Sequence, residues 1–551
     1  MKLKFSFYLI VLLIISCSCK VERKRSINTQ ALDEVVKSVM DDNNIHGLSV
    51  AVVKGNDTKF LESYGVLHNG TETKVDSETL FSAQSLSKTF TALAVIVAEQ
   101  EQLLKLDSPI IEYLPEFKVG SVHEKNASAR ITLRHLLSHT SGLPADAPVG
   151  NIFSPSFNNY DSFPLSERVL SVNNVWLKDS VGVNYNYSNI GFDIAAHIIE
   201  KVSGQSFSEY LREHILIPLK MKNSTFELNT IPSHSNRARG HCFGVNEELP
   251  VLFSSVGAGG LYTTVADMSN FLKSAINQFQ EILNQKSHDE FIRIPFSKRN
   301  NGYALGIQVN EVNYCVPYYS HTGNGFGFTA TMAWFPTESL GMVILSNRES
   351  VYSGLTSIQQ TILEHYAKPD FLKSNCTDID EYPKEIKKEE ISYYQSISGG
   401  YSNGNVLLEF ELRGNKFGVL SPSNGDFNAF HFVSKNHWVF RDGTETIHFK
   451  LKNDRLTNLN NGMTFSKIAN HTNANAKSNP LWENYEGRYR AYAYGVLESV
   501  ENIELINGHL HLNGNMLYEK FPNIFFDQFG QVVDFSQGNA KIEYASYHKI
   551  D

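Results

Sequence analysis

The sequence predicts an α+β domain followed by a separate all-β region. Apolar segments of strand length stand at both ends of the first 368 residues, helical periodicity fills the stretch between them, and beyond residue 390 the helical signal fades. With 551 residues, 42% of them hydrophobic and 19% charged, the chain can form more than one packed core. We therefore expect a sheet that gathers distant segments, with helices packed on it.

The N-terminus has the pattern of a secretory signal peptide. Two lysines precede an apolar run from Phe5 to Ile15, which is too short to span a bilayer. An Ile-Ile-Ser-Cys sequence ending at Cys17 resembles the bacterial lipobox, whose Cys becomes lipidated after cleavage. We expect residues 1–19 to direct export, and Cys17 to anchor a lipoprotein that faces the periplasm or cell surface. A soluble secreted protein cleaved near Cys19 is the alternative.

Charge and cysteine content exclude several classes of function. The 49 Lys and Arg and the 58 Asp and Glu give a net charge of −9, spread along the chain without a basic stripe. Five scattered cysteines predict neither a disulfide framework nor a zinc site. We expect no nucleic-acid partner, no metal and no cofactor.

The first domain, residues 28–368, is expected to begin with a helix and a hairpin. A helix is predicted over Leu32–Met40. Two β-rich runs, Gly47–Val53 and Phe60–Val66, flank a Gly-Asn-Asp turn at residues 55–57. This pattern predicts a hairpin at the start of the sheet.

Helices dominate the middle of this domain. The stretch from Ser85 to about Glu101 is apolar at helical spacing and lacks Gly and Pro, which predicts a buried helix. Two apolar runs of strand length, Ala330–Phe335 and Met342–Ser346, and a helix over Ser357–Tyr366 follow near its end. Further helices are predicted over residues 131–138, 190–202, 206–214 and 265–275.

The chain changes character at residues 369–390. Two prolines and a run of charged side chains predict a linker there. In residues 391–551, alternating segments such as Val406–Leu412 and Ile503–Leu512 predict all-β structure.

The all-β region contains a weak internal repeat. Gly399-Gly400-Tyr401 and Gly487-Arg488-Tyr489 begin two segments, each followed by a Gly-Asn or Asn-Gly hairpin turn. The repeat predicts either two β units, residues 391–470 and 481–551, or two halves of one barrel.

Ser85-Leu86-Ser87-Lys88, at the start of the predicted buried helix, is the first candidate for chemistry. Residues three apart lie on one helix face, so the Lys88 amine can approach the Ser85 hydroxyl. A neutral amine can accept the Ser proton, and a helix N-terminus stabilises the negative charge that develops. A capping Ser with a solvated Lys gives the same short pattern, and the surrounding sequence decides between the two.

The segment around Ser85, residues 81–92, resembles the nucleophile segment of the serine β-lactamase and penicillin-binding protein superfamily, especially its class C and D-alanyl-D-alanine carboxypeptidase branch. Downstream, Tyr187-Ser188-Asn189 matches the Tyr-x-Asn element of that branch, and His321-Thr322-Gly323 matches its Lys-Thr-Gly element. The resemblance covers about Leu32–Ala367 and implies a β-lactamase/transpeptidase-like antiparallel sheet with an all-helical region. The C-terminal region resembles the lipocalin-like accessory domains of some relatives.

The resemblance implies a role for each matching residue. Ser85 would be acylated, with Lys88 and Tyr187 sharing proton transfer and Asn189 holding a substrate amide. A phenol near a Lys ammonium is expected to have a lowered pKa, which would suit Tyr187 to relay the proton.

The third motif would supply one wall of the site. His321, Thr322 and Gly323 would line it from a strand, and the N–H of Asn324 would join that of Ser85 as the oxyanion hole. His321 departs from the family pattern, in which a Lys supplies a permanent positive charge toward the carboxylate of penicillins and D-Ala-D-Ala termini. A His titrates near neutrality and offers less positive charge. Family members with His at this place look more like esterases, D-aminopeptidases and other peptidases, although some still bind penicillin.

Two further stretches, around His139 and Thr264, also resemble the family, and their physical interpretation is structural. Thr264 followed by Asp267 is typical of a helix N-cap. His135 and His139 stand four residues apart but lack the Glu of an HExxH zinc motif, so we expect no metal site.

The sequence thus predicts an exported serine hydrolase that acts through a Ser85 acyl-enzyme on an ester or a small D-amino-acid-containing peptide. The alternative enzyme is a penicillin-binding D-alanyl-D-alanine carboxypeptidase or a weak class C-like β-lactamase. The alternative outside enzymes is a pseudoenzyme that binds cell-wall fragments. The expected partners are the small substrate and, through the lipid anchor, a membrane.

Overall fold

The structure is a computed structural model. It describes residues 27–149, 163–242, 249, 251, 253–295, 302–310, 316–368, 371 and 382–402, and, in the C-terminal region, 407–420, 427–442, 445–452, 455–458, 464–467, 480–493, 496–506, 509–512, 515–521, 523–527, 532–535, 540–542 and 545–549. Three predicted features lie wholly or largely outside these residues: the signal peptide with Cys17, the linker, and the Asn-Gly hairpin turn of the second repeat, at residues 507 and 508.

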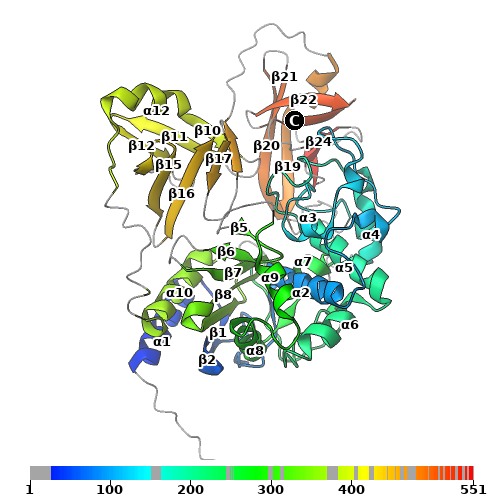
Figure 1. Cartoon of the computed structure of the whole chain (residues 1–551), viewed down its shortest axis with the longest axis vertical. Helices are drawn as coiled ribbons and strands as arrows, with labels where there is room; N and C mark the ends of the chain where they lie inside the picture. The colour runs from blue at the N-terminus through cyan, green and yellow to red at the C-terminus, as the bar shows by residue number, and fades with distance from the viewer. Residues whose placement is uncertain are drawn as a thin grey trace, which may run out of the picture.

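A seven-stranded antiparallel sheet forms the centre of the first domain (Figure 1). Its order is β2-β1-β9-β8-β7-β6-β5, so the first hairpin pairs with a strand some 300 residues further along the chain. This gathering of distant segments was predicted from the apolar runs. The bounds are β1 (Gly47–Lys54), β2 (Asp57–Gly65), β5 (Gly302–Tyr303), β6 (Gln308–Asn310), β7 (Tyr318–Gly325), β8 (Phe328–Phe335) and β9 (Leu340–Ser346).

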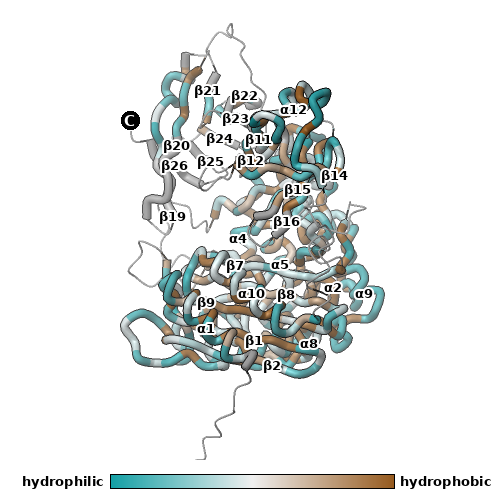
Figure 2. The backbone as a smooth tube through the Cα atoms, turned by 90° about the vertical axis from the view of Figure 1, so that its left-hand side faces the viewer, coloured by the Kyte–Doolittle hydropathy of each residue, from teal (hydrophilic) through white to brown (hydrophobic). Residues whose placement is uncertain are grey.

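Helices cover both faces of this sheet, and the sequence of β1 shows why. Val50 and Val52 pack in one core with α1 (Ile27–Asp42) and α10 (Tyr352–Tyr366). Ala51 and Val53, which point the other way, join the larger core with α2 (Ser87–Gln100) and α8 (Val265–Ile276). A strand buried on both faces is apolar at successive positions, as β1 is (Figure 2).

A helical region completes the first domain and encloses α2, whose side chains from Ser87 to Ala98 are all buried. The predicted helices are confirmed, the one over residues 206–214 as a short α-helix followed by a π-helical turn (Arg212–Leu216). The remaining helices are α3 (Leu133–Leu137), α4 (Leu165–Leu170), α5 (Asn189–Ser203), α6 (Phe207–Leu211), α7 (Val256–Gly259) and α9 (Gln285–Ile292).

The C-terminal region contains two β units with separate cores, which confirms the all-β prediction (Figure 1). A nine-stranded sheet comprises β10 (Gly399–Ser402), β11 (Leu407–Arg413), β12 (Lys416–Leu420), β13 (Phe427–Ala429), β14 (His431–Ser434), β15 (His437–Asp442), β16 (Glu445–Lys452), β17 (Arg455–Asn458) and β18 (Thr464–Lys467), preceded by α12 (Ile391–Ile397). A closed barrel comprises β19 (Gly487–Ala493), β20 (Val496–Ile506), β21 (His509–Leu512), β22 (Asn515–Phe521), β23 (Ile524–Asp527), β24 (Val532–Asp534), β25 (Ala540–Ile542) and β26 (Ala545–Lys549). The two repeated motifs, which begin at Gly399 and Gly487, lie at the start of β10 and β19, the first strand of each unit.

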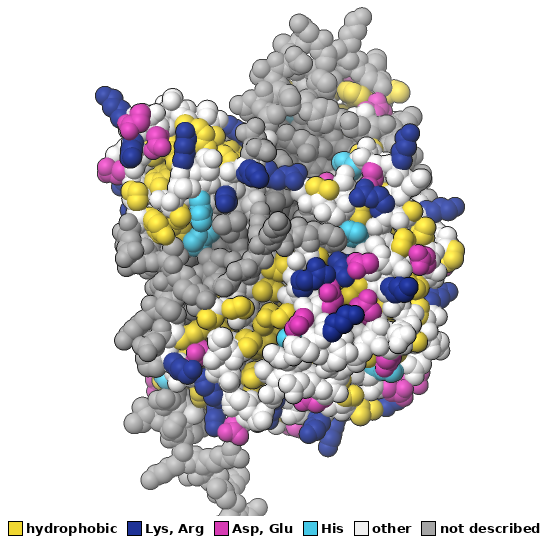
Figure 3. Space-filling model, in the orientation of Figure 1, with side chains coloured by type: hydrophobic (Ala, Val, Ile, Leu, Met, Phe, Trp, Pro, Cys, Tyr) yellow, Lys and Arg dark blue, Asp and Glu magenta, His cyan; other side chains and the backbone are white. Residues whose placement is uncertain are grey.

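The chain passes from the first domain to the β region between residues 368 and 386. The Lys368 N–H donates to Glu338 of the first domain (3.1 Å), whereas the Ile386 N–H donates to the Asn415 carbonyl (2.8 Å). Among the described residues, no helix combines the length and apolarity needed to cross a membrane. Basic and acidic side chains are interspersed on the face drawn in Figure 3.

Candidate active site

Ser85 lies in a 3₁₀ turn (η1, Gln84–Leu86) that leads into α2, a turn earlier than the α-helix itself begins. Gln84 adopts φ 50°, a left-handed conformation that is uncommon outside glycine. Two hydrogen bonds hold it there: its side-chain amide donates to Ser82 Oγ (2.7 Å), and its carbonyl accepts from Ser87 Oγ (2.6 Å). Ser85 therefore lies on a fixed, strained turn at the N-terminal end of a buried helix.

Lys88 is fully buried, and its Nζ lies 3.0 Å from Ser85 Oγ. The amine donates to Asn189 Oδ1 (2.7 Å) and to the Ala258 carbonyl (3.1 Å). Burial lowers the pKa of Lys88 from its ordinary 10.5 to about 7. Since both oxygens can only accept, they take the two N–H groups of the neutral amine, and its lone pair is left facing Ser85. This geometry would allow neutral Lys88 to accept the Ser85 proton.

Tyr187 approaches Ser85 from another side, with 2.8 Å between its Oη and Ser85 Oγ. Lys88 Nζ lies 4.8 Å from the centre of its ring. The prediction of a lowered pKa for this phenol is wrong, because burial raises the pKa of Tyr187. Tyr187 therefore keeps its proton and is suited to donate it.

The Tyr-x-Asn sequence, residues 187–189, contains the N-terminal cap and the first residue of α5. Its middle residue, Ser188, is the N-cap: Ser188 Oγ accepts from the Gly191 N–H (3.2 Å) and donates to the Pro144 carbonyl (2.7 Å). Anchoring the cap fixes the residues on either side of it, and this directs Tyr187 and Asn189 to the same serine and lysine.

The third motif lies on β7, against the turn that carries Ser85. A Cβ at Gly323 would lie 2.3 Å from the Ala83 carbonyl oxygen and 3.0 Å from the Ser85 nitrogen, so only glycine allows this approach. Asn324 follows and lines the same cavity as Ser85. The oxyanion hole formed by the N–H groups of these two residues stays a prediction. Thr322 hydrogen-bonds with Tyr352, which the sequence did not single out.

His321 is an uncharged hydrogen-bonding link within this wall. Its Nδ1 lies 2.7 Å from the Thr322 carbonyl, which can only accept, so Nδ1 carries the proton and Nε2 accepts from Tyr303 Oη (2.7 Å). The expectation that it titrates near neutrality is wrong, because burial lowers the pKa of His321 to about 3. No cation therefore stands where the family pattern has Lys.

The two histidines at residues 135 and 139 have structural roles. Thr132 and His135 form a capping box at the start of α3. His139 lies among four aromatic rings, the nearest being that of Tyr187 at 4.4 Å. Thr264 caps α8 by accepting from the Asp267 N–H, as predicted. Within the described part of the chain, no group of three or more His, Cys, Asp or Glu is placed to hold a metal ion.

A buried ionic network supports the lysine, and nothing in the sequence pointed to it. Arg168 is fully buried and pairs with both Asp146 and Asp193. Asp193 accepts from the Gly257 and Ala258 N–H groups (3.0 and 3.3 Å), which places the Ala258 carbonyl that Lys88 uses. Burial raises the pKa of Asp193, and the Arg168 guanidinium opposes that rise.

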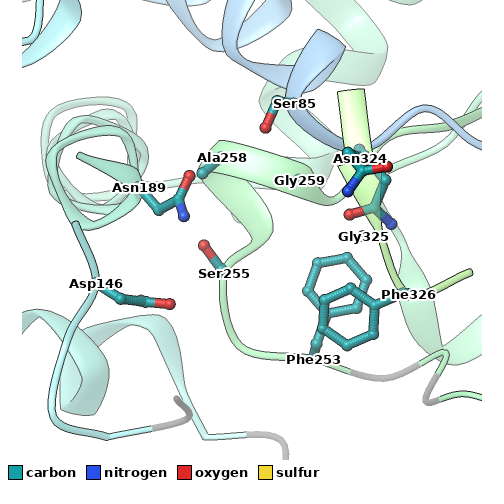
Figure 4. Close-up of a pocket in the computed structure, with 11 residues that line it drawn as sticks. Ser85, Asp146, Asn189, Phe253, Ser255, Ala258, Gly259, Asn324, Gly325 and Phe326 are labelled. Atoms are coloured by element: carbon teal, nitrogen blue, oxygen red, sulfur yellow. The ribbon is translucent and has the colours of Figure 1, made fainter. Parts of the chain in front are cut away.

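An open cavity gives access to Ser85 (Figure 4). The residues that line it are Gln84, Ser85, Asp146, Asn189, Phe253, Ser255, Ala258, Gly259, Asn324, Gly325 and Phe326.

The antiparallel sheet with its helical region, and the order of the three motifs, are those of the serine β-lactamase and penicillin-binding protein superfamily, whose members are in general serine hydrolases. The family model described as "Beta-lactamase" matches residues 32–365, more than half of the chain. The chain therefore belongs to the β-lactamase family.

Named relatives agree with this assignment. Protein flp of Staphylococcus aureus (strain MW2) is 26% identical over 330 residues, which are 59% of this chain and 64% of that protein. This chain thus spans less than two thirds of the length of flp. Beta-lactamase-like protein 2 of Dictyostelium discoideum is 25% identical over 436 residues, 73% of this chain and 75% of that protein.

Solved structures show the same fold. The octameric penicillin-binding protein homologue from Pyrococcus abyssi aligns with a TM-score of 0.54 at 20% identity, covering 79% of this chain and 99% of that one. The crystal structure of SurE with D-Leu also gives a TM-score of 0.54, at 16% identity, covering 80% and 99%.

Proposed function

We propose that this chain is an exported serine hydrolase that acts through an acyl-enzyme on Ser85, with an ester or a small D-amino-acid-containing peptide as substrate. One observation carries the proposal: Ser85 Oγ lies within hydrogen-bond distance of both a buried lysine amine and a buried phenol. Nucleophile and base thus have the geometry that covalent catalysis requires.

The proposed acylation has two steps, and over both of them one proton passes from Ser85 to the leaving group. Ser85 Oγ attacks the acyl carbon while its proton passes to Lys88 Nζ, and the N–H groups of Ser85 and Asn324 stabilise the oxyanion. The bond to the leaving group then breaks, with the Tyr187 phenol giving that group its proton and Lys88 returning one to the phenol. Water repeats the sequence on the acyl-enzyme, which releases the acid and restores Ser85.

The charge at the site favours an ester or amine-bearing substrate over a penicillin. A penicillin or a D-Ala-D-Ala terminus brings a carboxylate, whereas His321 is neutral and no Lys or Arg is among the described residues lining the cavity. The carboxypeptidase and β-lactamase activities are therefore the weaker enzymatic alternatives. A pseudoenzyme would not require the Ser85 hydroxyl, the Lys88 amine and the Tyr187 phenol to lie within hydrogen-bond distance, so this geometry argues against that alternative.

Hydrolysis of p-nitrophenyl acetate tests the proposal. We expect Ser85→Ala to lower kcat/KM by more than about a thousandfold, because the nucleophile is lost. Ser38→Ala, which removes an exposed hydroxyl on α1, is the matched control and retains the wild-type rate. Turnover that survives in Ser85→Ala would rule out Ser85 as the nucleophile.

We also propose that the mature protein is held at a membrane surface by a lipid on Cys17. The lysines and the apolar run that precede the lipobox-like sequence support this. Expressed in a bacterium fed an alkyne-tagged fatty acid, the wild type should become labelled and Cys17→Ser should not. An unlabelled wild-type protein in the medium would favour the soluble secreted alternative.

A further inference from the structure

The cavity in front of Ser85 has two chemically different walls (Figure 4). On one side Asn189 and Ser255 lead from Ser85 to Asp146, and on the other lie the rings of Phe253 and Phe326. Asp146 is the only ionisable side chain among the described residues that line the cavity. The Asp146 side chain is 13% exposed, and its carboxylate points toward the middle of the cavity (Figure 4).

Acidic side chains outnumber basic ones at this wall, even when the buried arginine beside it is counted. Arg168 is shared between Asp146 and Asp193. Every hydrogen-bond partner found for Asp193 donates to it: the Arg168 Nε–H, the Ser255 hydroxyl and two backbone N–H groups. The single Arg168 guanidinium is shared between two acidic side chains, only one of which, Asp146, lines the cavity.

The apolar wall is firmly held. The rings of Phe253 and Phe326 stack with centroids 4.5 Å apart and planes 22° apart. Phe326 adopts a left-handed backbone conformation, with φ 50°. A Cβ at Gly240 would lie 2.1 Å from the Phe326 carbonyl oxygen, so the turn between β7 and β8 packs directly against this glycine. The Gly327 N–H, next along the turn, donates to Glu349 (2.8 Å). Packing and hydrogen bonding therefore support the unusual backbone that presents Phe326.

We propose that this cavity selects acyl substrates that carry an ammonium group toward Asp146 and an apolar group against the Phe253 and Phe326 rings. The inference rests on the proposed function, since it specifies which substrates reach Ser85. The substrate class is an ester or short amide of an amino-bearing, apolar acid. An ammonium group would find a partly exposed carboxylate, whereas a carboxylate in its place would be repelled.

Three p-nitrophenyl esters that differ only in one terminal group test the charge preference. The 6-aminohexanoate ends in an ammonium group, the heptanoate in a methyl group and the heptanedioate monoester in a carboxylate. For the wild-type chain we expect kcat/KM to be about tenfold higher for the ammonium ester than for the methyl ester, and lowest for the carboxylate ester. Equal or reversed values in the wild type would overturn the proposal without recourse to any variant.

Two substitutions locate the preference. Asp146→Asn should bring the ratio between the ammonium and methyl esters to about one, whereas Asp41→Asn, an exposed acid on α1, should leave the ratio as in the wild type. Phe253→Ala should lower kcat/KM for the heptanoate relative to the acetate. A ratio that stays high in a folded Asp146→Asn protein would show that another group binds the ammonium and would overturn the assignment.

The same assay separates the two proposals. If the heptanoate is hydrolysed through Ser85 but the ammonium ester is not preferred, the proposal for the two walls fails and the serine-hydrolase proposal stands. If none of the three esters is hydrolysed and a fluorophosphonate does not label Ser85, the proposed function itself fails.

Discussion

At the scale of residues, the hydrogen-bond donors and acceptors around Lys88 support its proposed role as the base. A neutral amine has two N–H groups, and Asn189 Oδ1 with the Ala258 carbonyl accepts both, which leaves the lone pair for Ser85. Burial stabilises this neutral form of Lys88 while it stabilises the protonated form of Tyr187. Burial therefore lowers the pKa of Lys88 and raises that of Tyr187, which agrees with the proposed roles of Lys88 as base and Tyr187 as acid.

The pH dependence of kcat/KM should follow Lys88. Its pKa of about 7 means that the amine is protonated, and cannot accept the Ser85 proton, at acidic pH. With a neutral ester, kcat/KM should rise about tenfold per pH unit up to about 7 and then level off. A flat profile between pH 5 and 8 would contradict the role of Lys88 as the base.

The variant His321→Gln is the control for that profile. Because the His321 imidazole stays neutral above about pH 3, its removal should leave the midpoint of the profile near 7. Disappearance of the rise in His321→Gln would assign the titration to the imidazole instead.

At the scale of elements, the close approach of β7 to the Ser85 turn sets the geometry of the site. A methyl group at Gly323 meets backbone atoms of Ala83 and Ser85, which cannot move aside as a side chain can. Gly323→Ala should therefore lower kcat, and it should lower the free energy of unfolding by about 1–3 kcal/mol.

Gly191→Ala is the matched control, because a Cβ at Gly191 meets its neighbours at ordinary contact distance, 3.5 Å or more. Steady-state kinetics and thermal melts of both variants provide the comparison. Wild-type kcat in a folded Gly323→Ala protein would show that the strand does not position Ser85.

The predicted strands β1, β8 and β9 are apolar, whereas β7 is polar. β1, β8 and β9 are buried almost throughout, so their composition identified them. β7 reads Tyr-Tyr-Ser-His-Thr-Gly-Asn-Gly and alternates between buried and partly exposed positions. Periodicity did not find it, and only the resemblance of His321-Thr322-Gly323 to a family motif placed these residues at the site.

At the scale of the whole molecule, contacts between distant residues account for what could not be predicted. Arg168 reaches Asp146 and Asp193, which stand 22 and 25 residues away in the sequence, and these pairs form only once α4 and α5 pack. Phe253 and Phe326 likewise meet only in the fold. The three motifs were predictable because each is a short local sequence, whereas the cavity walls are assembled from several elements.

The division of the chain between separate cores makes a prediction about proteolysis. Lys368 still contacts the first domain and Ile386 already belongs to the core of the nine-stranded sheet. Limited proteolysis should therefore cut between them and leave two folded fragments, detectable by mass spectrometry and by separate melting transitions. Uniform degradation of the chain would contradict this division.

Labelling with a fluorophosphonate, followed by intact mass and peptide mapping, tests the central claim most directly. The account predicts a single adduct on Ser85 that forms faster at pH 8 than at pH 6, because more Lys88 is neutral at the higher pH. A parallel incubation with a penicillin should give little or no adduct in the same time, since His321 is neutral. No fluorophosphonate adduct at pH 8, or an adduct on another residue, would contradict the account.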